Sequence, residues 1–267
     1  MKKALKIGGW SIFVLGVFVL LFFVNAGYDD IETREPQITI IKPGNHNFVT
    51  EEKVKAVMND LGYSFKDQSL GDIELGRIEM EVGSIPGVKD VQAYKYSNGV
   101  VKLDIEQQLP VARVILKGGK MGCYLDAQGD IIPLSPDYIA KVPVFSGYIY
   151  EPYNEIPSVS EITVNDSISD LHILDEIHTL GLALVQDEFL AAQILQVYVN
   201  EKEEFELIPR VGNHRILFGG IEDYEDKLFR LKYFYTEADI NIKELNIYDT
   251  LNLKFKDQIV GSTRLYY

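Results

Sequence analysis

Histidine, cysteine and acidic residues are the side chains of this sequence that could do chemistry, and their spacing forms no known catalytic motif. The chain has four histidines and one cysteine, Cys123. No two histidines stand four residues apart, and the Gly-x-Ser-x-Gly, Gly-Lys-Ser/Thr and His-Glu-x-x-His patterns are missing. A lone cysteine excludes an intrachain disulfide and the Cys₂His₂ and Cys₄ zinc sites. We therefore expect no catalytic residues, no metal site, no cofactor and no enzyme activity.

The weaker candidates for chemistry have structural interpretations that fit better. His178 falls on the apolar side of an expected helix, which is typical of a satisfied core residue. Asp126 and Asp130 could suggest a calcium site, but a hairpin turn explains them more simply. Gly219 and Gly220 could form an anion-binding nest, yet the acidic residues that follow would repel a phosphate. A tight turn is the expectation there.

Charge is distributed unevenly along the 267 residues, whose net charge is -14 at pH 7. Residues 1–28 hold Lys2, Lys3 and Lys6 and no acidic residue, so the remainder is strongly acidic. An acidic surface repels a phosphate backbone, so we expect no nucleic-acid partner. A composition of 46% hydrophobic and 25% charged residues is globular, and the length suits one large domain or two ordinary ones.

Residues 7–28 carry no charge and are expected to form a transmembrane anchor. A helix of this length, with about 1.5 Å of rise per residue, spans a hydrocarbon core of about 30 Å. Because the lysines precede this segment and acidic residues follow it, the positive-inside rule puts the amino terminus in the cytoplasm. A signal peptide cleaved near Val24-Asn25-Ala26 is the alternative, although its apolar region would be longer than usual. Both interpretations export residues 29–267.

A β-α-α-β-β module is expected after a short linker over residues 29–36. Gln37 to Lys42 reads as a strand, and Thr50 is a good N-cap for the helix that follows. Asp72 is an N-cap candidate for a second helix that ends before Pro86-Gly87. Two strands joined by a turn at Ser97-Asn98-Gly99 complete the module, giving two helices on one face of a three-stranded sheet.

A second, mostly antiparallel β-domain with flanking helices is expected after Pro110. Its strands are expected at 111–116, 121–125, 131–134, 194–199, 205–209, 214–218, 244–255 and 259–265. Helices are expected over Leu171 to Leu182, opened by Asp166 or Ser167, and over Tyr224 to Ala238. Residues 148–165 look like a long surface excursion. The fold class is therefore α+β, with a single amino-terminal transmembrane helix.

This order of elements, together with several local motifs, resembles the FtsQ/DivIB family of bacterial cell-division proteins. The module at residues 37–110 resembles that family's POTRA domain, and residues 111–267 resemble its β-domain. The matching segments are Ile85-Pro86-Gly87-Val88 with Val91, Glu106 to Ala112, Leu125 to Ile131 with Val142 to Gly147, Phe205-Glu206-Leu207 with Ile216 to Gly219 and Lys227-Leu228, and Asn252 to Phe255. The resemblance implies a cytoplasmic tail at 1–6, an anchor at 7–28, a linker at 29–36 and these two domains.

The resemblance also implies a non-catalytic scaffold in the inner (cytoplasmic) membrane at the division septum. Its partners would be small bitopic proteins of the FtsB and FtsL type, whose complex controls septal peptidoglycan synthesis. Such a partner would add a strand to the last strand of the β-domain, and no small-molecule substrate is implied. Lys254 and Phe255 of the late motif, and Ile259 and Val260 of the following strand, are the partner-binding residues that the resemblance suggests.

The residues themselves favour the same region, because a terminal strand is usually a sheet edge that offers unpaired backbone groups. The alternative is that Phe255 and Val260 only complete the core of the β-domain. Two other functions stay open at this stage. One is another POTRA-containing component of envelope assembly or secretion. The other is an anchored envelope enzyme, which no sequence motif supports.

Overall fold

The computed structural model describes residues 10, 13–19, 31–44, 47–65, 68–119, 122–135, 139–150, 173–237 and 245–263. The expected anchor lies largely outside these ranges, and its described residues, Trp10 and 13–19, are helical and exposed. Within the described ranges, no helix has the length and apolar character needed to cross a bilayer. His46, His172 and most of the expected excursion also lie outside them.

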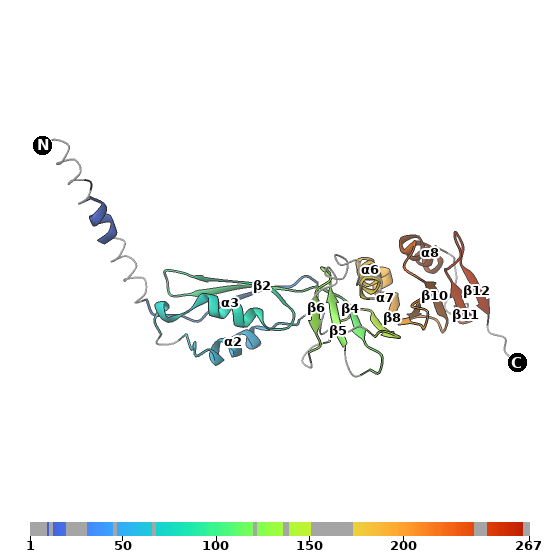
Figure 1. Ribbon diagram of the computed structural model, residues 1–267, viewed down its shortest axis with the longest axis horizontal. Coiled ribbons are helices and arrows are strands. Elements are labelled where there is room, and N and C mark those ends of the chain that lie inside the picture. The colour runs from blue at the N-terminus through green and yellow to red at the C-terminus, as the bar shows by residue number, and fades with distance from the viewer. Residues whose placement is uncertain are drawn as a thin grey trace. The chain divides into compact units, whose positions relative to one another are not determined.

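The chain divides into two compact units (Figure 1). The first holds residues 1–43 and 47–107, and the second holds residues 44–46 and 108–267. Each combines helices with one sheet, so the expected α+β class is confirmed.

The first unit has the expected element order. Its elements are β1 (Gln37–Ile41), α2 (Glu51–Asp60), the short 3-10 helix η1 (Leu70–Asp72), α3 (Leu75–Gly83), β2 (Val88–Lys95) and β3 (Val101–Gln107). The sheet order is β1-β3-β2, with β1 parallel and β2 antiparallel to β3. Along β3 the buried Val101, Leu103 and Ile105 alternate with half-buried Lys102 and Asp104. This alternation means that one face of the sheet holds the core under the helices.

Local signals set most of the helix and turn boundaries of this unit. The Thr50 side chain accepts from the Lys53 N–H and caps α2, as expected. Gly99 has a φ of 83° in the turn between β2 and β3, a conformation that favours glycine. The prediction of Asp72 as an N-cap is wrong, because Asp72 lies in η1 and α3 begins after Glu74 without a side-chain cap. Ser69 caps η1 instead, so the chain makes an extra turn before α3.

The second unit contains one sheet of nine strands with three helices in its described part. The strands are β4 (Pro110–Ile115), β5 (Gly122–Asp126), β6 (Ile131–Pro133), β7 (Val144–Gly147), β8 (Ile194–Val199), β9 (Phe205–Pro209), β10 (Arg215–Gly219), β11 (Tyr248–Asn252) and β12 (Val260–Thr263). The helices are α6 (Leu174–Gln186), α7 (Glu188–Gln193) and α8 (Tyr224–Glu237). The sheet order is β12-β11-β10-β9-β8-β7-β4-β5-β6.

Most neighbouring strands of this sheet are antiparallel, but three pairs are parallel. β7 is parallel to β4 and to β8, and β10 is parallel to β11. A parallel pair needs a crossover connection, and two of these connections contain helices. The chain between β7 and β8 includes α6 and α7, and the chain between β10 and β11 includes α8.

The core of the second unit lies between the helices and one face of the nine-stranded sheet. Ile177, Leu180 and Leu184 of α6 are fully buried and belong to one apolar cluster with Phe145 of β7. Gly181 lets α6 approach β4, because an added Cβ would lie 3.1 Å from the carbonyl oxygen of Val111. α8 completes the layer with two further buried side chains, Leu228 and Leu231.

Two details of the helical layer differ from expectation. α6 begins at Leu174 rather than near Asp166 or Ser167, which lie outside the described ranges. The short helix α7 was not expected, because its six residues are too few to show a helical period. Its N-cap Asp187 accepts from the Phe189 and Leu190 N–H groups.

Candidate protein-interaction site

The outermost strand β12 is an edge of the nine-stranded sheet. It is antiparallel to β11, with Asn252 opposite Val260 and Thr250 opposite Ser262. All four residues of β12 are exposed. Among the described residues no strand pairs with its outer side, so its backbone groups there are available to an added strand.

The sequence-predicted site residues lie in or next to the loop that joins β11 to β12. Phe255 is 48% exposed and Val260 is 43% exposed, so neither side chain completes the core. Ile259 is partly buried and packs against the core. The Lys254 ammonium lies 2.6 Å from the Glu204 carboxylate, which lowers the pKa of Glu204 through that hydrogen bond. Phe255 and Val260 are therefore open to a partner, while Lys254 already has one within the chain.

Arg230 of α8 holds this loop in place. Its guanidinium donates to the carbonyl oxygens of Leu253, Phe255 and Gln258 and pairs with Asp226 at 2.8 Å. The Arg230 side chain is only 13% exposed. Because one planar group satisfies three loop carbonyls, it fixes the entry of the chain into β12.

A hollow of about 400 Å³ lies between α8 and the same loop. It is lined by Phe229, Arg230, Tyr233, Phe234, Asp257, Gln258 and Ile259. Phe229 is 68% exposed and Tyr233 is 59% exposed, and their rings stack with centroids 6.5 Å apart. Two large exposed aromatic side chains beside the loop that leads into the edge strand β12 form a combination typical of an interface anchor.

Sequence reasoning missed Phe229 and Tyr233, although a signal was present. The helical period put Leu228, Leu231, Phe234 and Tyr235 on the inner face of this helix. Phe229 and Tyr233 stand four residues apart on the opposite side, where a solvated helix usually has polar residues. We name the exposed residues Phe229, Tyr233, Phe255 and Val260, together with the outer edge of β12, the α8–β12 surface.

The other edge of the sheet is less suited to adding a strand. β6 has three residues, and one of them is Pro133. Proline has no N–H to donate, and short edge strands with proline resist pairing. The two ends of the sheet therefore differ, and β12 is the open one.

The groups that could do chemistry have structural roles in the second unit. Cys123 is fully buried, and burial raises the pKa of its thiol to about 12, so the reactive thiolate is disfavoured. Asp126 is also fully buried, and its Oδ1 accepts from the N–H groups of Gln128 and Asp130, as a hairpin turn requires. Within the described residues, no three His, Cys, Asp or Glu side chains are arranged to hold a metal ion.

The remaining candidates are two histidines and the glycine pair. His214 is buried, and its Nε2 lies 2.6 Å from the Tyr235 hydroxyl. His178 is half-buried, and no described residue is a hydrogen-bond partner of its Nε2, so the expectation of a satisfied core side chain is not confirmed. Gly219 ends β10, and the carbonyl oxygen of Gly220 accepts from the Lys227 ammonium at 2.9 Å. The turn follows the glycine pair, where the Tyr224 N–H donates to the Ile221 carbonyl oxygen at 3.1 Å.

Comparisons with known proteins match both units. A family model described as FtsQ/DivIB, C-terminal related, matches residues 109–262, and a model of a POTRA-like domain matches residues 33–106. The chain is 24% identical over 195 residues to the cell division protein FtsQ of Rhodothermus marinus. That alignment covers 72% of this chain and 66% of the relative, which is just under two thirds of the relative's length.

Proposed function

We propose a function from the premise that the chain belongs to the FtsQ/DivIB family, whose C-terminal-related model matches more than half of its residues. The chain acts as a cell-division scaffold without a catalytic step of its own. Its second unit binds small bitopic proteins of the FtsB and FtsL type, and that complex helps to control septal peptidoglycan synthesis. The POTRA-like first unit contributes to placing the chain at the division site.

One observation carries this proposal: β12 is an exposed sheet edge with nothing paired to its outer side in the described part of the chain. A partner strand that adds to β12 forms main-chain hydrogen bonds, which give affinity. Side chains of that strand then contact Val260 on one face, while flanking residues contact Phe229 and Tyr233. The exposure of these apolar side chains supports the proposal, because burying them on binding is favourable.

The proposed location is the cytoplasmic membrane, which residues 7–28 cross once. Their uncharged composition and the lysines before them support this topology. Both folded units then lie on the far side of the membrane, where they meet the extracytoplasmic parts of other bitopic proteins. The alternative of an envelope assembly or secretion component has less support, because the family match spans the second unit and not only the POTRA-like one.

A charge at the free edge tests the proposal. Val260→Asp puts a carboxylate where a partner strand would pack, and desolvating it on binding is costly. We expect recovery of FtsB- and FtsL-type proteins with the full chain to fall about tenfold, which corresponds to about 1.4 kcal/mol of binding free energy. Quantitative co-purification from cells that express tagged full chain measures this recovery.

Leu195→Asp is the matched control. Leu195 lies in β8 of the same sheet and is 43% exposed, the same fraction as Val260. It is not part of the α8–β12 surface, so its substitution should leave recovery unchanged. Equal recovery of partners with Val260→Asp and Leu195→Asp would exclude the α8–β12 surface as the binding site. Recovery of outer-membrane barrel proteins in place of bitopic ones would favour the alternative function.

A further inference from the structure

The segment that leads from the proposed anchor into β1 is tied to the first unit by backbone hydrogen bonds. The Ile31 carbonyl oxygen accepts from the Leu70 N–H at 2.7 Å, and the Thr33 N–H donates to the Gln68 carbonyl oxygen at 2.9 Å. The Thr33 side chain is buried, and its hydroxyl donates to the same oxygen. In its described part, the linker expected at 29–36 therefore belongs to the folded unit.

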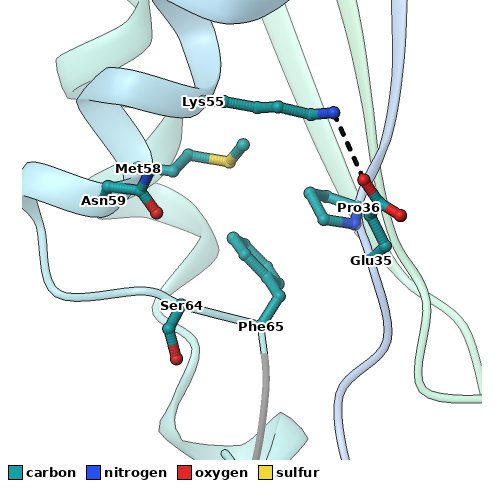
Figure 2. A pocket seen from close by; sticks show the side chains of 7 residues that line it. All are labelled: Glu35, Pro36, Lys55, Met58, Asn59, Ser64 and Phe65. Carbon is teal, nitrogen blue, oxygen red and sulfur yellow. Dashed lines mark hydrogen bonds and ion pairs between the residues drawn. The ribbon is translucent and has the colours of Figure 1, made fainter.

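The turn between β2 and β3 also holds this segment. The Arg34 N–H donates to the Gly99 carbonyl oxygen at 2.8 Å. A Cβ added at Gly99 would lie 2.2 Å from the carbonyl oxygen of Glu32, so the two backbones approach closely only because this residue is glycine. The Glu35 carboxylate pairs with the Lys55 ammonium of α2 at 3.4 Å (Figure 2). The segment is thus fixed to η1, to α2 and to the β2–β3 turn.

This attachment limits how far one end of the first unit can lie from the membrane. Ile31 is three residues after residue 28, the end of the proposed anchor. An extended chain spans at most about 3.6 Å per residue, so Ile31 lies within about 11 Å of residue 28. The headgroup layer on each side of a bilayer is about 5–7 Å thick. The end that contains η1 and the β2–β3 turn therefore lies within reach of the headgroups.

Two exposed tyrosines lie beside the β2–β3 turn. Tyr94 is 41% exposed and Tyr96 is 48% exposed. Tyr94 lies opposite Lys102 of β3, whose neighbours Val101 and Leu103 are buried under the helices. Because successive side chains of a strand point to opposite faces, Tyr94 belongs to the face of the sheet that the helices do not cover.

The charges next to the two rings cancel. The Lys102 ammonium lies 2.6 Å from the Asp104 carboxylate. That hydrogen bond is the main cause that raises the pKa of Lys102, and Tyr96 and Tyr94 add to it, so both hydroxyls lie near the ammonium. A neutral ion pair does not repel phospholipid phosphates. Tyrosine has an apolar ring with a polar tip, and such rings favour the headgroup level of a bilayer.

We propose, on the basis of the membrane location proposed above, that Tyr94 and Tyr96 rest in the phospholipid headgroup region of the bilayer that holds the anchor. The contact gives the first unit one preferred orientation on the membrane surface. It uses the uncovered face of the three-stranded sheet at its β2–β3 end, and it is separate from the α8–β12 surface, which belongs to the other unit.

Fluorescence quenching by brominated lipids tests the proposal. Trp10 is the only tryptophan of the chain, so Trp10→Phe combined with Tyr96→Trp leaves one reporter, beside the turn. The full chain is inserted into phosphatidylcholine nanodiscs whose acyl chains are either plain or brominated close to the headgroup. We expect emission from position 96 to be at least about twofold weaker in the brominated discs, because a ring at the headgroup level meets the bromine atoms. Circular dichroism checks the fold.

Ile41→Trp in the same Trp10→Phe background is the matched control. Ile41 is 56% exposed and lies on the same uncovered face, opposite Glu106, whereas Gln37 at the start of β1 lies opposite Lys102. The reporter is thereby moved about 13 Å along the strand, away from the turn. Its emission should be equal in plain and brominated discs. Equal quenching at positions 41 and 96 would overturn the proposal, because the tyrosine end would then have no preference for the bilayer.

Trp10 of the wild-type chain separates this proposal from the proposed location. It lies within residues 7–28, so brominated lipids should quench it if that segment crosses the bilayer. Quenching of Trp10 without quenching at position 96 would overturn the tyrosine contact alone and would favour a protein partner for these rings. A Trp10 that brominated lipids do not quench would overturn both the location and the contact.

Discussion

Single residues decide whether the α8–β12 surface is ordered enough to bind. Arg230 contacts three carbonyl oxygens of the loop that leads into β12, and no other described side chain makes such a set of bonds there. The sequence could not predict this role, because Arg230 and Gln258 are 28 residues apart. By contrast, the Thr50 cap was predictable, because the Thr50 hydroxyl and the Lys53 N–H group that it accepts from are only three residues apart.

Arg230→Lys should loosen the β11–β12 loop while keeping the charge on α8. An ammonium cannot reach three carbonyl oxygens in one plane, so we expect about 1–2 kcal/mol less unfolding free energy. Hydrogen exchange of residues 253–263 should become faster, and partner affinity should fall. Arg215→Lys is the control, because Arg215 pairs with Glu206 on the surface of the sheet and its side chain is 62% exposed. Unchanged exchange in Arg230→Lys would show that the loop is held by other contacts.

His214 gives the second unit a dependence on pH. Burial lowers the pKa of His214, and a backbone hydrogen bond to Leu245 opposes this only in part. The folded chain therefore keeps His214 neutral, whereas the unfolded chain protonates it near the ordinary value of about 6.5. Between the lowered native pKa and about pH 6.5, the unfolded state therefore binds more protons than the folded state. The stability that the neutral His214 contributes is complete above about pH 6.5 and is lost as the pH falls through the lowered native pKa.

His214→Gln should remove this part of the pH dependence. An amide can keep a hydrogen bond to the Tyr235 hydroxyl but does not titrate. Between pH 7.5 and 5.5 the wild type should lose more unfolding free energy than the variant, because only the wild type has this titrating group. Urea unfolding at several pH values measures the difference, and parallel curves for the two proteins would contradict the assignment to His214.

At the scale of elements, the strands were predictable and their order in the sheet was not. Alternating apolar residues fixed β8 and β9 at their observed bounds, because the pattern is local. The parallel pairs β7–β8 and β10–β11 follow from packing of α6, α7 and α8 on one face, which no local pattern reveals. The prediction that the last strand lies at a sheet edge rested only on its position in the sequence, and β12 does lie at an edge.

The outer side of α8 should contribute to binding without contributing to stability. Phe229→Ala and Tyr233→Ala remove exposed rings, so the unfolding free energy should change by less than about 0.5 kcal/mol for each. Each should weaken partner binding by about 1–2 kcal/mol, as expected for aromatic interface anchors. Met80→Ala is the control, because Met80 of α3 is 65% exposed and lies in the other unit. Equal binding by all three variants would exclude α8 from the interface.

At the scale of the whole molecule, the topology at the membrane decides which partners the two units can meet. An uncleaved anchor predicts that the amino-terminal peptide stays on the mature chain and that the chain remains in membranes after carbonate extraction. Mass spectrometry of the purified protein and fractionation of cells test both outcomes. A mature chain that begins after Ala26 would instead support the cleaved signal peptide.

The division function predicts a phenotype for the complete chain. Cells depleted of the protein should form filaments with unconstricted septa, and expression of wild type from a second copy should restore division. A Val260→Asp copy should fail to restore it, although the variant accumulates to the same level in membranes. Normal division after depletion would contradict the functional proposal as a whole.

Hydrogen exchange of the full chain with and without its FtsB- and FtsL-type partners tests directly whether a partner strand adds to β12. We expect strong slowing of amide exchange at residues 260–263 in the complex and unchanged exchange at β6, the opposite edge of the same sheet. Unchanged exchange at β12 in a complex that has formed, or slowing confined to β6, would contradict it.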